Sequence, residues 1–140
     1  REGATDRASF QNFSFNFDSA AGIIYTVDVT KPKGEKITII SMADGTPFSM
    51  DKMYKVALNS YRGNGGGELL TKGAGIPQDE LKGRILFSTD KDLRYYLMQY
   101  IEKKGVIEPH ALGQWKFIPE EWVEPAAKRD YEYLFGKVEK

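Results

Sequence analysis

Apolar and polar residues alternate in the first third of the chain, and this pattern predicts β-strands. Three phenylalanines occupy every second position of residues 13–17, so a strand there would carry three aromatic rings on one face. Residues 22–29 and 36–42 are rich in β-branched and aromatic side chains, which is typical of strands. Residues 1–12 show no such period, and we interpret them as an extended lead-in.

A glycine-rich segment follows a fourth predicted strand. Residues 53–59 alternate, with Tyr54, Val56 and Leu58 facing one way. They run into residues 59–67, where four glycines fall within five positions. So much backbone freedom is unsuited to a strand or helix interior, so we expect a loop with unusual backbone angles or a close approach to a ligand.

The second half of the chain contains one strong helical pattern. Residues 89–92 have the form of a capping box, Gly105 supplies a stop, and the apolar positions between them repeat at helical spacing: Leu93, Tyr96, Leu97, Tyr100 and Ile101. We expect its aromatic members, Tyr96 and Tyr100, to lie in the core. The other expected elements are short: a helix start over residues 77–81, strands over 84–87 and 114–118, and a helical tail over 126–135.

These elements predict one α+β domain, a mostly antiparallel sheet with packed helices, over residues 1–140. We expect residues 119–140 to be a tail extension and the domain to be incomplete on its N-terminal side. The sequence begins at Arg1 rather than Met, which favours further residues upstream.

Composition excludes several classes of function. The chain has 20 basic and 20 acidic residues, so its formal net charge is zero and it lacks the long-range field that gathers nucleic acids. Without cysteine there is no thiol nucleophile, zinc-thiolate site or disulfide. His110 is the single histidine, too few for a two-metal hydrolase centre, so we predict no catalytic or metal-binding residue here.

The glycine-rich loop is the best candidate for binding chemistry. Freed backbone N–H groups can surround an anion, and polar side chains stand beside them: Asn59, Tyr61, Arg62 and Asn64. The loop is not a P-loop, because Lys72 lies between Thr71 and Gly73 instead of following a glycine. A purely structural turn explains the glycines equally well.

Three segments resemble the C-terminal domain of the 5′-nucleotidase family. They are FDSAAGIIYTVDVTKPKG at residues 17–34, DGTP at 44–47 and YKVALNSYRGNGGG at 54–67, and the likeness covers about residues 17–118. The resemblance implies an extracytoplasmic protein, periplasmic or surface-anchored, that takes part in nucleotide catabolism. In such hydrolases a separate metallophosphoesterase domain holds two divalent metal ions, and the C-terminal domain binds the nucleoside between two aromatic rings.

By this resemblance Phe17 takes the place of the first ring, and Asn59, Tyr61, Arg62 and Asn64 orient the ribose or base of a nucleoside or nucleotide. This chain itself would hold no cofactor and would not hydrolyse anything alone. A metallophosphoesterase domain or chain would be its partner.

One departure from the family pattern leaves an alternative open. The family usually reads Asn-Gly-Gly-Asp-Gly followed by an aromatic residue, whereas here Gly67 replaces the aspartate and Leu69 stands where the second ring would be. The alternative is a non-catalytic interaction module that docks on a separate metallophosphatase and has lost the nucleoside pocket.

Overall fold

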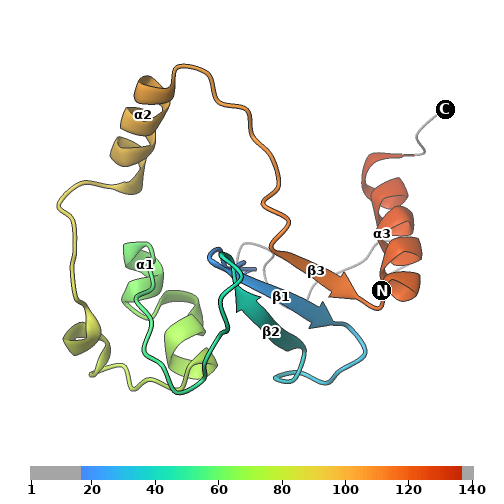
Figure 1. Ribbon diagram of the computed structural model, residues 1–140, viewed down its shortest axis with the longest axis horizontal. Helices are drawn as coiled ribbons and strands as arrows, with labels where there is room; N and C mark the ends of the chain where they lie inside the picture. The colour runs from blue at the N-terminus through green and yellow to red at the C-terminus, as the bar shows by residue number, and fades with distance from the viewer. Residues whose placement is uncertain (1–16, 137–140) are drawn as a thin grey trace. The chain divides into compact units, whose positions relative to one another are not determined.

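The computed structural model describes residues 17–136 (Figure 1), which divide into two compact units. Within the described residues the first unit comprises 17–52 and 111–136, and the second comprises Met53–His110. The predicted lead-in and all of the first predicted strand except Phe17 lie outside the described residues. The single-domain organisation stays a prediction.

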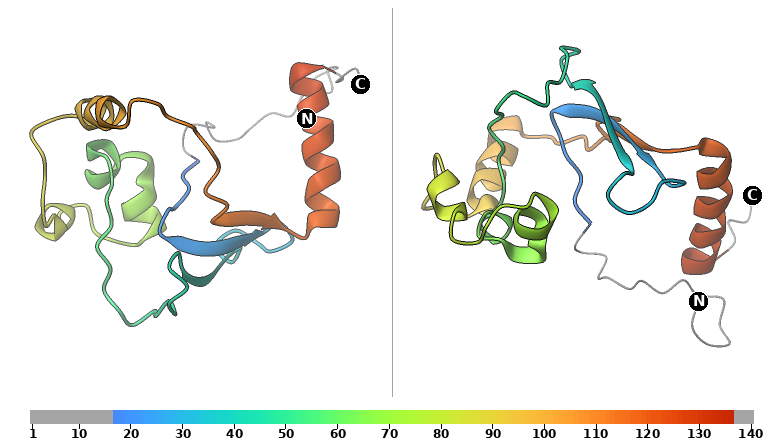
Figure 2. Two further views of the ribbon diagram at one scale, coloured as in Figure 1. Left: turned by 45° about the horizontal axis from the view of Figure 1, so that its top comes forward. Right: turned by 90° about the horizontal axis from the view of Figure 1, so that it is seen from below.

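A three-stranded sheet organises the first unit, with β1 (Ile23–Asp28) between β2 (Ile37–Met42) and β3 (Trp115–Ile118), as the left view of Figure 2 shows. β2 runs antiparallel to β1, with a register irregularity between Ile24 and Tyr25, and β3 runs parallel to β1. The three strands confirm the predictions for residues 22–29, 36–42 and 114–118. With its helices the chain is an α+β fold, and its sheet is mixed.

An aromatic cluster forms the core of this sheet. Tyr25, which is 6% exposed, stacks on Trp115 with ring centroids 5.9 Å apart and planes within 12°. Phe117 meets the edge of Trp115 at 5.1 Å, and Phe17 lies tilted against it at 5.9 Å. Such pairs add to the free energy gained by burying the rings.

Helix α3 (Glu120–Phe135) follows β3 directly and is longer than the predicted tail helix over residues 126–135. Its first turn carries Glu120 and Glu121, whose charges favour the positive end of the helix dipole. Glu120 also pairs with Lys116 at 2.5 Å. The helix begins directly after its N-cap residue, Pro119, and continues through Pro125.

The second unit contains only helical elements and connecting segments among its assigned structure. These are α1 (Ser60–Gly63), η2 (Gly66–Glu68), η3 (Leu69–Gly73), η4 (Leu81–Arg84) and α2 (Leu93–Lys104). The strand predictions for residues 53–59 and 84–87 are wrong, because neither segment pairs with a described strand. An alternating pattern forms a stable strand only when a partner strand lies beside it. The helix start predicted over 77–81 is a turn that leads into η4.

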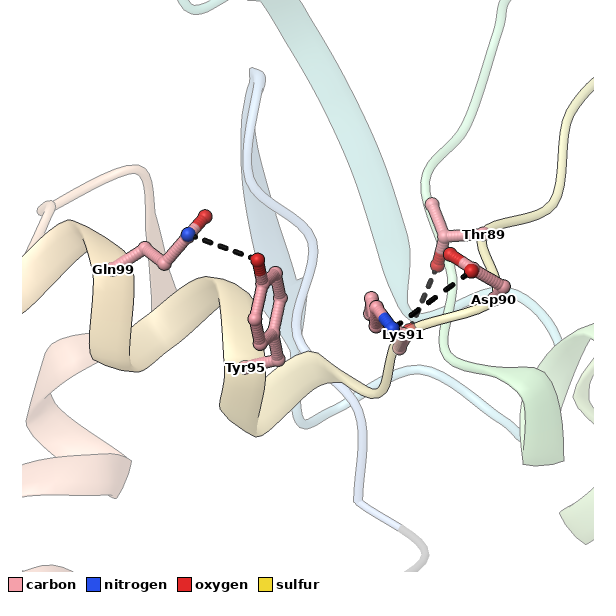
Figure 3. A network of polar contacts seen from close by, with 5 residues as sticks. All are labelled: Thr89, Asp90, Lys91, Tyr95 and Gln99. Carbon is pink, nitrogen blue, oxygen red and sulfur yellow. Dashed lines mark hydrogen bonds and ion pairs between the residues drawn. The ribbon is translucent and has the colours of Figure 1, made fainter.

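Helix α2 confirms the predicted helix. The Asp92 carboxylate accepts a hydrogen bond from the Tyr95 N–H at 2.9 Å, and Gly105, with φ +74°, ends the helix. Polar contacts of Thr89, Asp90, Lys91, Tyr95 and Gln99 flank this start (Figure 3).

The prediction that Tyr96 and Tyr100 lie in the core is wrong, and the whole apolar stripe of α2 is exposed. Its five side chains are 41–73% exposed. No element of its own unit packs extensively against the helix, so the amphipathic pattern is present without a surface to bury it.

Candidate functional site

A single turn of helix organises the glycine-rich loop. Asn59 caps α1, because its side-chain oxygen accepts the Arg62 N–H at 2.8 Å and its carbonyl accepts the Gly63 N–H at 2.9 Å. The Asn64 N–H then donates to the Ser60 carbonyl at 2.9 Å. Two of the predicted site residues thus begin and end the turn on which Tyr61 and Arg62 lie.

Arg62 lies inside the loop. It is 6% exposed, the one buried charged residue among the described residues. Its Nη1 donates to the Gly66 carbonyl at 3.1 Å, and its guanidinium carbon lies 5.3 Å from the centre of the Tyr61 ring. The sequence prediction placed this side chain toward a ligand, and that role stays a prediction.

The glycines allow a backbone path that other residues rarely follow. Gly65 and Gly67 have φ of +91° and +68°, in the left-handed region that favours glycine. Gly66 is needed for space: a Cβ there would lie 2.5 Å from a carbon of the Tyr61 ring. The ring therefore rests directly against the loop backbone.

The loop presents Tyr61 and Asn64 at its surface. Tyr61 is 56% exposed even though its ring contacts Gly66 and Arg62. The Asn64 side chain is exposed, and the backbone carbonyl of Asn64 accepts a hydrogen bond from Gln78 Nε2 at 3.0 Å. The structure thus brings together the four predicted residues of the second unit.

Two residues that support the loop were missed by sequence reasoning. Gln78 bonds to Asn64, and a Cβ on Gly65 would meet the side chains of both Gln78 and Leu81. They come from a turn and a short 3₁₀ helix, and no periodic pattern in the sequence indicates their contact with the glycines.

The fifth predicted residue, Phe17, belongs to the first unit. Its ring is 63% exposed and tilts against Trp115. Beside Trp115 lies an open, mostly apolar groove, formed by residues 19–21 and 111–115. The backbone N–H groups of Ala20 and Gly22 donate to Tyr25 Oη at 3.2 Å and Gln114 Oε1 at 3.0 Å, which fixes the segment after Phe17 on the sheet.

Leu69, the residue at the second ring's place in the family pattern, starts η3 and is half-buried. The residue before it, Glu68, is the one described non-glycine residue with a left-handed φ, at +62°. Its carboxylate pairs with Lys72 at 2.6 Å on the exposed surface.

Within residues 17–136 no three His, Asp or Glu side chains gather where they could hold a metal ion. His110 is exposed, with Nδ1 3.2 Å from the Glu108 backbone carbonyl. The same part of the chain has no helix that is long and apolar enough to cross a bilayer.

Comparison with known proteins shows which family the chain is similar to. The sequence pattern of the family described as 5′-nucleotidase, C-terminal domain, matches residues 3–72. The chain is 31% identical over 121 residues to the trifunctional nucleotide phosphoesterase protein YfkN of Bacillus subtilis (strain 168). It is 26% identical over 121 residues to a 2′,3′-cyclic-nucleotide 2′-phosphodiesterase/3′-nucleotidase of Haemophilus influenzae.

These alignments cover most of this chain and a small part of each relative. The first includes 78% of this chain and 8% of the relative, and the second includes 76% and 17%. No solved structure matches the chain significantly.

Proposed function

Because the chain belongs to the 5′-nucleotidase C-terminal domain family, we propose that it is the nucleoside- or nucleotide-binding part of a 5′-nucleotidase-like phosphohydrolase. Its role is substrate specificity, and hydrolysis takes place at a metallophosphoesterase domain or chain other than this one. The names of both relatives describe phosphoesterases that act on nucleotides, which supports this class of substrate.

The observation that carries the proposal is the exposed Tyr61 ring on a preformed glycine loop. The ring is held against Gly66 and beside Arg62, so little ordering remains when a base stacks on it. Stacking of a base on an aromatic side chain contributes roughly 1–3 kcal/mol and tolerates different bases. The exposed amide of Asn64 can donate to and accept from a ribose or base at the same loop.

Phe17 is the second proposed stacking residue. Its ring is mostly exposed, although Trp115 lies against it, so a ring face is open to a planar ligand. By family resemblance the protein is extracytoplasmic, and this location is part of the proposal.

Calorimetric titration of adenosine, AMP and UDP-glucose tests the function. We expect saturable binding that weakens by roughly fivefold or more in Tyr61→Ala and in Phe17→Ala, because each removes one stacking ring. Tyr100→Ala is the matched control, since Tyr100 is 53% exposed on α2, outside the loop. The absence of binding to the wild-type chain, or equal binding by all four proteins, contradicts the proposal.

One observation favours the alternative function, an interaction module that docks on a metallophosphatase. The apolar stripe of α2 is exposed, and the neighbouring Leu86 and Phe87 are 77% and 82% exposed. Exposed apolar side chains gathered on one face of a helix are typical of protein interaction sites. This function predicts that Leu97→Glu abolishes association with a metallophosphoesterase domain, whereas Tyr61→Ala leaves it intact, as measured by sedimentation of the mixed proteins.

A further inference from the structure

Buried charge in the described chain is concentrated in one side chain, that of Arg62. A guanidinium is costly to remove from water unless its donors are satisfied. Here Nη1 donates to the Gly66 carbonyl at 3.1 Å, four residues along the chain. That bond closes the loop across the segment where Gly65 and Gly67 have positive φ.

The same guanidinium lies beside the Tyr61 ring, 5.3 Å from its centre. Within about 6 Å a cation is attracted to the face of an aromatic ring. The Tyr61 ring also contacts Gly66, where an added Cβ would overlap the ring. Arg62 and Gly66 therefore both position the Tyr61 ring, and Arg62 contacts Gly66 as well as the ring.

We infer that Arg62 is a positioning residue that holds the glycine loop closed and sets the Tyr61 ring in its exposed orientation from inside the loop. The inference deepens the proposed function and rests on it for its consequence in binding. It differs from the sequence prediction, in which Arg62 contacts the ligand. It also explains why an arginine follows Tyr61 directly: on the single turn α1 the two side chains are adjacent, and only a long, forked donor reaches both Gly66 and the ring.

The test compares Arg62→Met with Arg84→Met in the full chain. Methionine keeps the length and apolar stem of the side chain but donates no hydrogen bond. Arg84 is the matched control, because its guanidinium is exposed and donates to the Glu80 carboxylate at 2.8 Å, outside the glycine loop. Three quantities are measured: the hydrogen-exchange rates of the backbone amides of residues 64–68 without ligand, the NMR signals of the Tyr61 ring, and the affinity for adenosine.

In Arg62→Met we expect the amide hydrogen-exchange rates of the loop to rise roughly tenfold and the affinity for adenosine to fall roughly tenfold. A change of this size is typical of the loss of a hydrogen bond from a charged donor. The NMR signals of the Tyr61 ring should shift as well, whereas Arg84→Met should match the wild type in all three. A residue that only stabilises the fold would lower the melting temperature and leave the affinity of the folded protein unchanged, and that result overturns the inference.

Arg62→Lys provides a second variant should Arg62→Met fail to fold. Lysine keeps the charge beside Tyr61 but loses the fork, so loop exchange and affinity should lie between those of the wild type and a protein without the bond. Exchange rates equal to the wild type in the lysine variant overturn the inference. If the wild type binds no adenosine, the proposed function fails, and the exchange rates alone decide whether Arg62 positions the loop.

Discussion

At the scale of single residues, Gly66 couples the shape of the loop to the orientation of Tyr61. In Gly66→Ala the new Cβ would lie 2.5 Å from the ring and 2.6 Å from the Tyr61 carbonyl oxygen, so the ring must move. We expect adenosine affinity to fall by roughly tenfold, since overpacking of this kind costs about 1–3 kcal/mol. Titration of Gly63→Ala is the control, because no atom lies within 4 Å of a Cβ at that glycine.

Glu68 occupies a backbone conformation that costs an L-residue free energy. Its φ is +62°, and the family pattern has glycine at this position. Glu68→Gly should raise the free energy of unfolding by about 1 kcal/mol, the typical strain of such a residue. Chemical denaturation measures it. Glu68→Ala keeps the strained φ and loses the same exposed ion pair with Lys72, so a stabilised alanine variant would contradict this explanation.

Asp28 supplies a prediction about pH. The Thr30 hydroxyl and backbone N–H donate to its carboxylate at 2.6 and 2.9 Å, and these bonds lower the pKa of Asp28 below its ordinary value of 3.8. A lowered folded-state pKa means that this contribution to stability is complete above pH 3.8 and is lost as the pH falls through the folded value.

Removing the hydroxyl in Thr30→Val should therefore raise the pKa of Asp28 toward 3.8, as followed by NMR titration of its carboxyl carbon. Asp44 is an internal control: Thr46 lowers its pKa through the same pair of bonds, at 2.6 and 2.9 Å. Parallel movement of both pKa values would show that the hydroxyl of Thr30 is not the cause.

At the scale of elements, α2 depends on its own cap because little else in its unit supports it. Asp92→Ala removes the bond to the Tyr95 N–H and should cost about 1 kcal/mol of helix stability. Circular dichroism and amide exchange over Leu93–Lys104 measure the loss. Asp90→Ala should have little effect, because Asp90 is exposed and its ion pair with Lys91 is long, at 4.0 Å.

The sequence patterns predicted those elements that are determined by residues close to them in the chain. The α2 cap and glycine stop lie within the helix's own sequence, and residues 22–29 and 36–42 form a hairpin of neighbouring strands. By contrast, β3 pairs in parallel with β1 across a long connection, and nothing in residues 114–118 encodes that direction. Residues 53–59 alternate like a strand but have no strand partner in the described chain.

The candidate site divides in the same way. Glycine spacing identified the loop, and polar composition identified the four residues on it. Burial of Arg62 could not be predicted, because charged side chains are rarely buried and the Gly66 carbonyl that bonds it depends on the path of the backbone. Trp115 beside Phe17 comes from a strand nearly one hundred residues later and has no local signal.

At the scale of the whole molecule, the balanced charge disfavours nucleic acids as ligands but not single nucleotides. With 20 basic and 20 acidic residues, the chain gains little from the release of counterions by a phosphate backbone. A single-stranded oligonucleotide should therefore show no saturable binding at roughly physiological salt, as measured by fluorescence anisotropy. Binding whose affinity falls steeply with added salt would instead indicate an unrecognised basic surface.

The sheet has a consequence for how the chain behaves in concentrated solution. Among the described strands β1 has neighbours on both sides, so β2 and β3 each leave one row of backbone N–H and C=O groups without a strand beside it. Such edges template the addition of strands from other molecules, and Ile37 and Ile40 on β2 are 64% and 60% exposed. Each edge of the described sheet can therefore accept a strand from another molecule, and a lysine at an exposed position such as Ile40 should oppose that addition.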